Sequence, residues 1–344
     1  MRHFFALLVV GGLFILLSGC SEHERKDKSA VRIPVDIART IELSPEDASV
    51  IIVKSSSIET VDDIIVFDTT CVIKSGNQLL GFSLQTGKSV CRYSQPGRGP
   101  GEYIRVWDYG VVGDKLYLYD IDGKQVLFFT VGGDFLHSVK VSGAASDYPF
   151  QSLVPEPWSD GYIGKRVFGM PGVPELSAYG ADFRYASPRG IDELRSGIML
   201  WRQFFHGADG DILYNRFFSN EIQRITADTV SVKYFVDFGR YNLPDLEQDE
   251  YAYLDLLSKD SSTNRYAVVM SNFDENEQLF GFQYATGGNR CYALFNKVTG
   301  ECQAYRPVIP SGTVLQVFYH SGKLFAIGET DNQKEMAIYS FSLR

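Results

Sequence analysis

IIVFDTTCVIKSGNQLLGFSLQTGKSVCRY, residues 64–93, is the stretch that decides the fold class. It contains four short runs rich in β-branched and aromatic residues, separated by turn-forming residues such as Gly76-Asn77 and Thr86-Gly87. The runs are Ile64 to Asp68, Cys71 to Lys74, Leu79 to Leu84 and Ser89 to Tyr93. Short strands joined by tight turns predict a single antiparallel sheet.

The same plan recurs to the end of the chain. A second unit of four strands occupies residues 107–141, a less regular third occupies 150–186, and a fourth occupies 198–236. A fifth follows at 266–305, whereas the last, 314–341, has only three strands. Units of four antiparallel strands repeating every 40 to 50 residues or so are typical of a β-propeller, in which neighbouring units bury each other's faces.

We therefore expect an all-β, six-bladed β-propeller spanning residues 31–344, with a β-sandwich or a two-domain β protein as the alternative. The extended segment Arg32–Arg39 is expected to supply the missing outer strand of blade six and so close the ring. Closure would remove the exposed sheet edges that invite aggregation. A helix is expected to interrupt the pattern at Leu243–Ser258, where several leucines could share one face.

Composition excludes some classes of partner. The 344 residues include 33 basic and 42 acidic side chains, a formal net charge of −9. Nucleic acid is excluded as an expected partner, because binding its backbone requires a basic surface. The aromatic content of 14% favours extended structure over disorder.

The N-terminus predicts export and anchoring. Phe4–Leu17 is an apolar run, shorter than the roughly 20 residues that span a bilayer, and fits the apolar core of a signal peptide. The following Leu17-Ser18-Gly19-Cys20 resembles a bacterial lipobox, which implies cleavage after residue 19 and lipidation of Cys20. An ordinary signal peptide or a membrane helix is the alternative. Residues 20–30 read as a charged, flexible tether.

The resemblance to a lipoprotein implies attachment to the outer membrane. Glu22 and Glu24, close behind Cys20, also resemble the surface-export signals of some Gram-negative gut bacteria. Both the periplasmic side and the cell-surface side of that membrane stay open.

A glycine-rich segment, Gly97-Arg98-Gly99-Pro100-Gly101-Glu102-Tyr103, lies between the first two units, where the chain would cross from one blade to the next. Together with 211–225 and 234–239, it resembles the six-bladed propeller lipoproteins of gut-dwelling Gram-negative anaerobes, within the TolB-like and NHL-like group. Asn220, Glu221 and Gln223 depart from that group's usual pattern. The resemblance implies an envelope setting beside polymer uptake systems.

Four cysteines remain once Cys20 is assigned to the lipid: Cys71, Cys91, Cys291 and Cys302. Pairing about the turn at residues 297–300 would place Cys302 opposite Phe295, so its offset from Cys291 is too long for a disulfide. Free thiols and disulfides both stay open, and no Cys-x-x-Cys spacing indicates a metal site.

Motifs for catalysis are largely missing from the sequence. His137 is expected on an outer strand, and His206 and His320 at turns of the bottom face, so a shared metal is not expected. No nucleophile elbow, P-loop or dinucleotide fingerprint occurs. Most acidic residues, Asp274 among them, are interpreted as turn residues. A calcium site would need oxygen ligands from several inner strands. The order of acidic residues in the sequence indicates no carboxylate pair for glycoside hydrolysis.

The working surface is expected in the central funnel, on the face where the chain crosses between blades. Its candidate ligand-binding residues are Arg98, Glu102, Tyr103, Arg105, Trp107, Trp201 and Arg202. Against this interpretation, Glu102 could cap loop amides and Trp107 could fill the space between blades.

The expected function is a lipid-anchored, non-enzymatic module that binds or scaffolds a carbohydrate, a peptide or an envelope protein. The expectation includes no cofactor. The alternatives are a calcium-dependent hydrolase or lyase acting in the funnel, and a purely structural protein that docks a partner on its side face.

Overall fold

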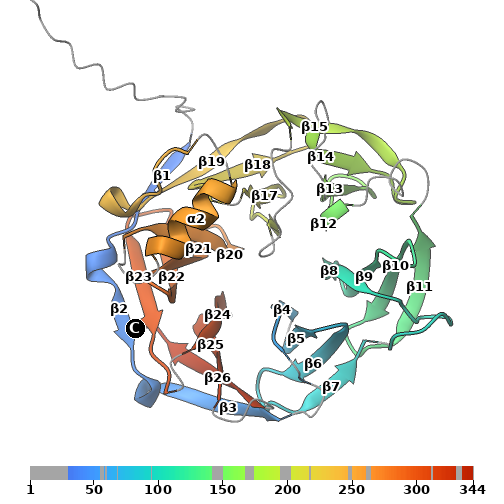
Figure 1. The fold of residues 1–344 in the computed structure, drawn as a ribbon, viewed down its shortest axis with the longest axis horizontal. Helices are drawn as coiled ribbons and strands as arrows, with labels where there is room; N and C mark the ends of the chain where they lie inside the picture. The colour runs from blue at the N-terminus through green and yellow to red at the C-terminus, as the bar shows by residue number, and fades with distance from the viewer. Residues whose placement is uncertain are drawn as a thin grey trace, which may run out of the picture.

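The computed structural model describes residues 30–54, 58, 60–67, 69–93, 95–141, 150–166, 174–193, 203–216, 218–246, 250–260, 265–310, 313–330 and 335–343. Within these ranges, six sheets surround a central axis as a six-bladed β-propeller (Figure 1). The expected all-β fold is therefore confirmed. The signal peptide, Cys20 and most of the tether lie outside the described residues.

The first three blades each contain four antiparallel strands in chain order from the axis outward. Blade one consists of β4 (Asp63–Phe67), β5 (Thr70–Ser75), β6 (Gln78–Ser83) and β7 (Ser89–Arg92). Blade two consists of β8 (Val106–Val112), β9 (Lys115–Asp120), β10 (Gln125–Thr130) and β11 (Phe135–Lys140). Blade three consists of β12 (Phe150–Pro155), β13 (Tyr162–Arg166), β14 (Pro174–Tyr179) and β15 (Tyr185–Glu193).

The last three blades also recruit strands from the N-terminal segment. Blade four consists of β16 (Phe204–His206), β17 (Ile212–Asn215), β18 (Glu221–Ile225) and β19 (Val230–Asp237), with β1 (Val31–Pro34) added outside. Blade five consists of β20 (Ala267–Glu275), β21 (Leu279–Thr286), β22 (Asn289–Asn296) and β23 (Cys302–Pro307), with β2 (Ile41–Leu43) outside. Blade six consists of β24 (Val314–His320), β25 (Lys323–Glu329), β26 (Glu335–Ser342) and β3 (Ala48–Lys54).

An N-terminal strand closes blade six as its outer strand, as expected, but the expected segment, 32–39, was wrong. The closing strand is β3, which pairs antiparallel with β26 and places Ile51 opposite Ile338. Its Val53 is 0% exposed and belongs to the core between blades six and one. Segment 32–39 lacks this role because Pro34 ends its strand after four residues and a short 3-10 turn, Ile37–Arg39, follows.

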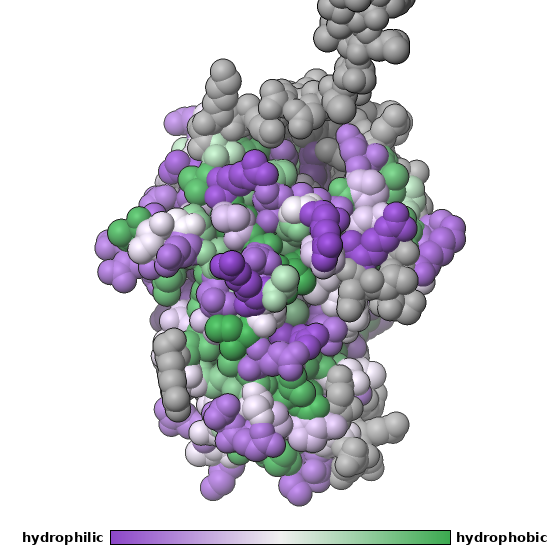
Figure 2. All heavy atoms as spheres, turned by 90° about the vertical axis from the view of Figure 1, so that its left-hand side faces the viewer, coloured by the Kyte–Doolittle hydropathy of each residue, from purple (hydrophilic) through white to green (hydrophobic). Residues whose placement is uncertain are grey.

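The N-terminal segment thus forms a strap, residues 31–54, along the outer edges of three successive blades (Figure 1). Its first two strands pair in parallel, β1 with β19 and β2 with β23. Seen from this side, the surface mixes hydrophobic with hydrophilic residues (Figure 2). The exposed apolar residues of the strap are Val31, Ile41, Val50 and Ile52. The strap covers edges that would otherwise offer unpaired backbone groups.

The core lies between blades. One cluster joins blades four and five through residues such as Tyr234 and Phe280, whose rings stack with centroids 4.3 Å apart. Another joins blades two and three and includes Tyr119 and Phe150. Each sheet therefore buries its faces against its neighbours, which explains why the short strands are stable only as a closed ring.

Helix α2 (Glu250–Asp260) interrupts the strands between blades four and five. It begins later than the expected Leu243, because Pro244 disfavours the helical conformation in the residue before it. Its Tyr253 stacks on Phe218, and the leucines expected to share its face pack around this pair. Among the described residues, no helix has the length and apolar character required to cross a membrane.

The cysteines agree with the predicted strand register. Cys302 lies opposite Phe295, as expected, and Cys291 lies opposite Tyr284 on the next strand. All four thiols in the described part of the chain, at 71, 91, 291 and 302, are free. Cys71 and Cys291 are buried.

Candidate functional site

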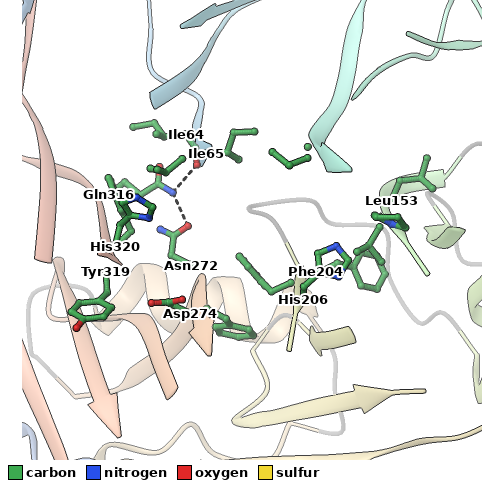
Figure 3. Close-up of a pocket in the computed structure, with 18 of the residues that line it drawn as sticks. Ile64, Ile65, Leu153, Phe204, His206, Asn272, Asp274, Gln316, Tyr319 and His320 are labelled. Atoms are coloured by element: carbon green, nitrogen blue, oxygen red, sulfur yellow. Dashed lines mark hydrogen bonds between the residues drawn. The ribbon is translucent and has the colours of Figure 1, made fainter. Parts of the chain in front are cut away.

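A cavity of about 290 Å³ lies at the centre of the ring. All six inner strands contribute to its wall, so blades that are distant in sequence meet there. Its apolar residues are Ile64, Ile65, Val66, Gly110, Val111, Leu153, Val154, Pro155, Phe204, Phe205, Phe273 and Phe318. Its polar residues are Tyr117, His206, Asn272, Asp274, Gln316, Tyr319 and His320. Most of the polar groups gather on blades five and six, with His206 across from them (Figure 3).

The cavity lies toward one end of the axis. Blade two contributes Gly110 and Val111 from the end of β8, and blade four contributes His206, the last residue of β16. The inner strands end where they turn into the second strands, whereas the crossover segments precede them. The cavity therefore lies toward the end opposite the crossovers. The working surface expected from the sequence lies at the crossover end instead.

A bulge in β20 shapes the polar side of the cavity. The register between β20 and β21 shifts on either side of Ser271, and Asn272 takes a left-handed conformation with φ 57°. Asn tolerates this conformation better than most residues. Its amide nitrogen donates to Gln283 Oε1 at 3.1 Å and to the carbonyl of Val317 at 3.0 Å. Bulges redirect side chains, and here both Asn272 and Asp274 line the cavity.

Gln316 connects three blades across the cavity wall (Figure 3). Its amide nitrogen donates to the carbonyl of Ile64 at 3.1 Å and to Asn272 Oδ1 at 2.8 Å. Blades one, five and six are thereby held together at the site. Such a satisfied polar network favours one fixed arrangement of the wall.

Two titratable groups of the cavity, Asp274 and His206, have shifted pKa values. Burial raises the pKa of Asp274, and the nearby His320 opposes that rise only in part. Burial lowers the pKa of His206, so this imidazole is neutral at pH 7. A carboxyl and two imidazoles therefore face one partly desolvated space, which is typical of sites that bind or transform a ligand.

These three residues were not among the sequence-based candidates. The sequence placed Asp274 in a turn, but it lies within β20, beside the bulge. His206 and His320 do end inner strands, as expected, yet both line the cavity. The single available signal was their shared position at strand ends, because the bulge that redirects Asp274 depends on contacts with Gln283 and Val317 that are remote in sequence.

The crossover between blades one and two is stabilised by its own polar residues. Glu102 accepts a hydrogen bond from the backbone N–H of Gly99 at 2.6 Å, and this bond is the main cause of its lowered pKa. A Cβ at Gly97 would clash with the Glu102 carboxylate, and Gly101 has φ 78°, which favours glycine. Tyr103 is buried and donates to the carbonyl of Asn77 at 2.7 Å.

The remaining crossover candidates lie on the same loop or the start of β8. Arg105 forms an ion pair with Asp122 at 2.8 Å and lies over the ring of Trp107, with 5.6 Å to its centroid. Trp107 packs into the cluster between blades two and three. Arg98 is exposed. None of these residues lines the cavity, and Trp201 and Arg202 lie outside the described residues.

Over the described ranges of the chain, no group of three or more His, Cys, Asp or Glu side chains is arranged to hold a metal ion.

The DUF4934 family, described as a domain of unknown function, matches residues 53–315. The chain belongs to the DUF4934 family. The match begins in the ring-closing strand β3 and ends in β24, so most of this DUF4934 propeller, including most of the cavity wall, lies within it. No functionally curated protein matches the chain.

Solved structures similar to this DUF4934 protein share its fold. A Bacteroides fragilis protein named as exported has a TM-score of 0.66 at 13% identity, over 92% of this chain and 100% of that one. A DUF4221 family member from Bacteroides vulgatus has a TM-score of 0.58 at 9% identity, over 86% of this chain and 97% of that one. At these identities, the likeness shows the β-propeller fold alone.

Proposed function

We propose that this protein is an exported, lipid-anchored binding module that holds one end of a carbohydrate or peptide in its central cavity. The observation that carries the proposal is the cavity of about 290 Å³ at the meeting point of all six inner strands. Concave, mostly apolar sites with a few convergent polar groups are where proteins bind small ligands. The volume is sufficient for a single small residue or ring.

Export and anchoring are supported by two observations. The lipobox-like Leu17-Ser18-Gly19-Cys20 follows an apolar run, and the similar Bacteroides fragilis protein is named as exported. We propose an outer-membrane location, on either its periplasmic or its surface side. Replacing Cys20 with Ala should move the protein from the membrane fraction to the soluble fraction. Acyl labelling that persists in that variant would overturn the anchor.

Ligand binding is tested by a thermal-shift screen of oligosaccharides and short peptides, since a ligand of the native state raises the melting temperature by mass action. Val111→Trp fills the cavity from β8 and should abolish every shift. Val298→Trp is the matched control, because Val298 lies at an exposed hairpin tip. Circular dichroism shows whether each variant is folded. Shifts that survive Val111→Trp would place binding elsewhere, for example at the crossover residues Arg98 and Arg105.

A calcium-dependent hydrolase or lyase is the second candidate function. The observation that favours it is the approach of Asp274 to His320, a carboxyl of raised pKa beside an imidazole in the cavity. Such a pair has the elements of general acid–base catalysis. The test is product formation from hits of the screen, with calcium and with chelator. Turnover that is lost in Asp274→Asn would favour this candidate over binding alone.

A further inference from the structure

The cavity contains one formal charge. Asp274 is the only Asp, Glu, Lys or Arg among the described residues that line it. None of the described side chains forms an ion pair or a hydrogen bond with its carboxylate, and its electrostatic neighbours include the imidazole of His320 and the hydroxyl of Tyr292. A carboxylate that is partly removed from water and has no Lys or Arg beside it in the cavity is costly. A ligand that carries a positive charge would offset this cost.

The hydrogen-bonding groups of the cavity also favour a ligand that donates. Both N–H groups of Asn272 donate within the protein, and so do both N–H groups of Gln316. The Tyr117 hydroxyl donates to the carbonyl of Leu153 at 2.6 Å. What Gln316 and Asp274 still offer to a ligand is therefore acceptor oxygen. His206, His320 and Tyr319 can each act as donor or acceptor, so the cavity as a whole favours a ligand rich in donors.

The walls suit an organic cation. Four phenylalanines line the cavity, and two of them, Phe205 and Phe273, pack with ring centroids 4.7 Å apart. Aromatic faces attract ammonium groups and also cover the apolar body that carries the charge. An anionic ligand would find no Lys or Arg among the described lining residues.

We propose that the cavity binds the primary ammonium group of a small organic ligand, with the charge on Asp274 and the body of the ligand against the phenylalanines. This inference rests on the proposed function and names its ligand class. A primary ammonium occurs both on amino sugars and on the amino termini of peptides. The shared chemistry is the ammonium donor, and the experiment distinguishes the two sources.

Two pairs of probes isolate the charge. Glucosamine and glucose differ in an ammonium against a hydroxyl on one sugar ring. Phenylalanine amide and 3-phenylpropanamide differ in an ammonium against a hydrogen. Isothermal titration calorimetry measures each probe against the wild type, Asp274→Asn and a matched control, Asp228→Asn. Asp228 lies at the exposed turn between β18 and β19, outside the cavity.

The expected result is that the ammonium probe of one pair binds the wild type roughly tenfold to a hundredfold more tightly than its neutral partner. Asp274→Asn should abolish that ratio, and Asp228→Asn should preserve it. A ratio confined to the sugar pair indicates amino sugars, and one confined to the amide pair indicates peptide amino termini. Thermal melts should show Asp274→Asn folded, because the change removes a charge that forms no ion pair with a described Lys or Arg.

Three outcomes would overturn the inference. In the first, neutral probes bind as tightly as ammonium probes. The cavity would then still be a binding site, but one without selectivity for an ammonium group. In the second, no ammonium probe binds at millimolar concentration, while the oligosaccharide and peptide screen still decides the proposed function independently. In the third, calcium alone binds the wild type and is lost in Asp274→Asn, which makes the carboxylate a metal ligand.

Discussion

Arg32 donates from its Nε to Oδ2 of Asp237 at 2.9 Å and so joins two strands that lie 205 residues apart in the chain. Asp237 also accepts from the side chain of Asn242 at 2.8 Å and from the N–H of Gly239 at 2.9 Å. One carboxylate thus attaches strand β1 to blade four and fixes the turn that follows β19.

Asp237→Asn should destabilise the protein more than Arg32→Ala. The Arg32 side chain is 65% exposed, so its ion pair contributes at most about 1 kcal/mol. Asp237 is 14% exposed, and its loss disturbs three hydrogen-bond partners, at a cost of about 2 kcal/mol. Urea unfolding of both variants measures the difference. An Arg32→Ala variant that loses as much as Asp237→Asn would show that the other two hydrogen bonds contribute little.

The contribution of Asp237 should depend on pH. Burial by itself raises the pKa of Asp237, but hydrogen bonds from Arg32, Asn242 and Gly239 outweigh burial and lower it. A carboxyl with a lowered native pKa stabilises the protein fully above its unfolded pKa, near 3.9, and loses this effect as pH falls through the native value. The stability gap between wild type and Asp237→Asn should therefore be constant near neutrality and close below about pH 4. A gap that persists at pH 2 would contradict this assignment.

Removing the strap in two steps should separate its roles. A chain that begins at residue 41 loses β1 alone and should stay folded, with a modestly lower melting temperature. A chain that begins at residue 60 also loses β2 and β3, exposes the edges of β23 and β26 and should aggregate or fail to fold. Differential scanning calorimetry and gel filtration measure both. Equal stability of the two truncated chains would refute β3 as the ring-closing strand.

Glu275→Gln should be among the most destabilising conservative changes. Its side chain is 0% exposed and accepts from Lys233 at 3.0 Å and from Lys297 at 3.2 Å. Removing this charge takes the carboxylate partner from Lys297 and leaves Lys233 with Asp209 and Asp211, at a cost of about 3 kcal/mol. Glu277→Gln, at an exposed turn, is the control and should cost little. Denaturant midpoints that agree between the two variants would contradict the network.

The cysteines should resist alkylation in the native state. Burial raises the pKa of Cys71 to about 12, that of Cys302 to about 12 and that of Cys291 to about 11, and it also raises the pKa of Cys91. The reactive thiolate is therefore scarce at pH 8. Iodoacetamide followed by mass spectrometry should modify them only after unfolding. Rapid labelling of native Cys71 would indicate local opening of blade one.

The repeat was predictable because each blade is local in sequence. Strands such as Lys115–Asp120 were placed correctly, since their alternation and turns lie within a few residues. Which N-terminal segment closes the ring could not be predicted from local sequence. Segment 32–39 is broken by Pro34 and by the 3-10 turn Ile37–Arg39, whereas 48–54 is one continuous strand, but the closing role of 48–54 depends on its pairing with the distant residues 335–342.

The cavity was less predictable than the fold. Its polar side depends on the left-handed conformation of Asn272, which is held by Gln283 from the neighbouring strand and by Val317 from the next blade. In the sequence, Asp274 stands among Asn and Glu residues that resemble any surface turn. The crossover was easier to recognise because its three glycines lie within one short segment, Gly97–Gly101, and the interpretation that Glu102 caps loop amides agrees with the hydrogen bond it accepts from the N–H of Gly99.

Strand β3 is synthesised early but paired late. Its partner, β26, is formed by residues 335–342, so the ring cannot close until those residues have been made. During synthesis from the N-terminus, five complete blades can form while β3 waits without a partner. The final pairing of β3 with β26 joins residues 48–54 to residues 335–342, and such long-range pairing is slow. Until that step, the edge of β26 stays unpaired, and unpaired strand edges favour aggregation.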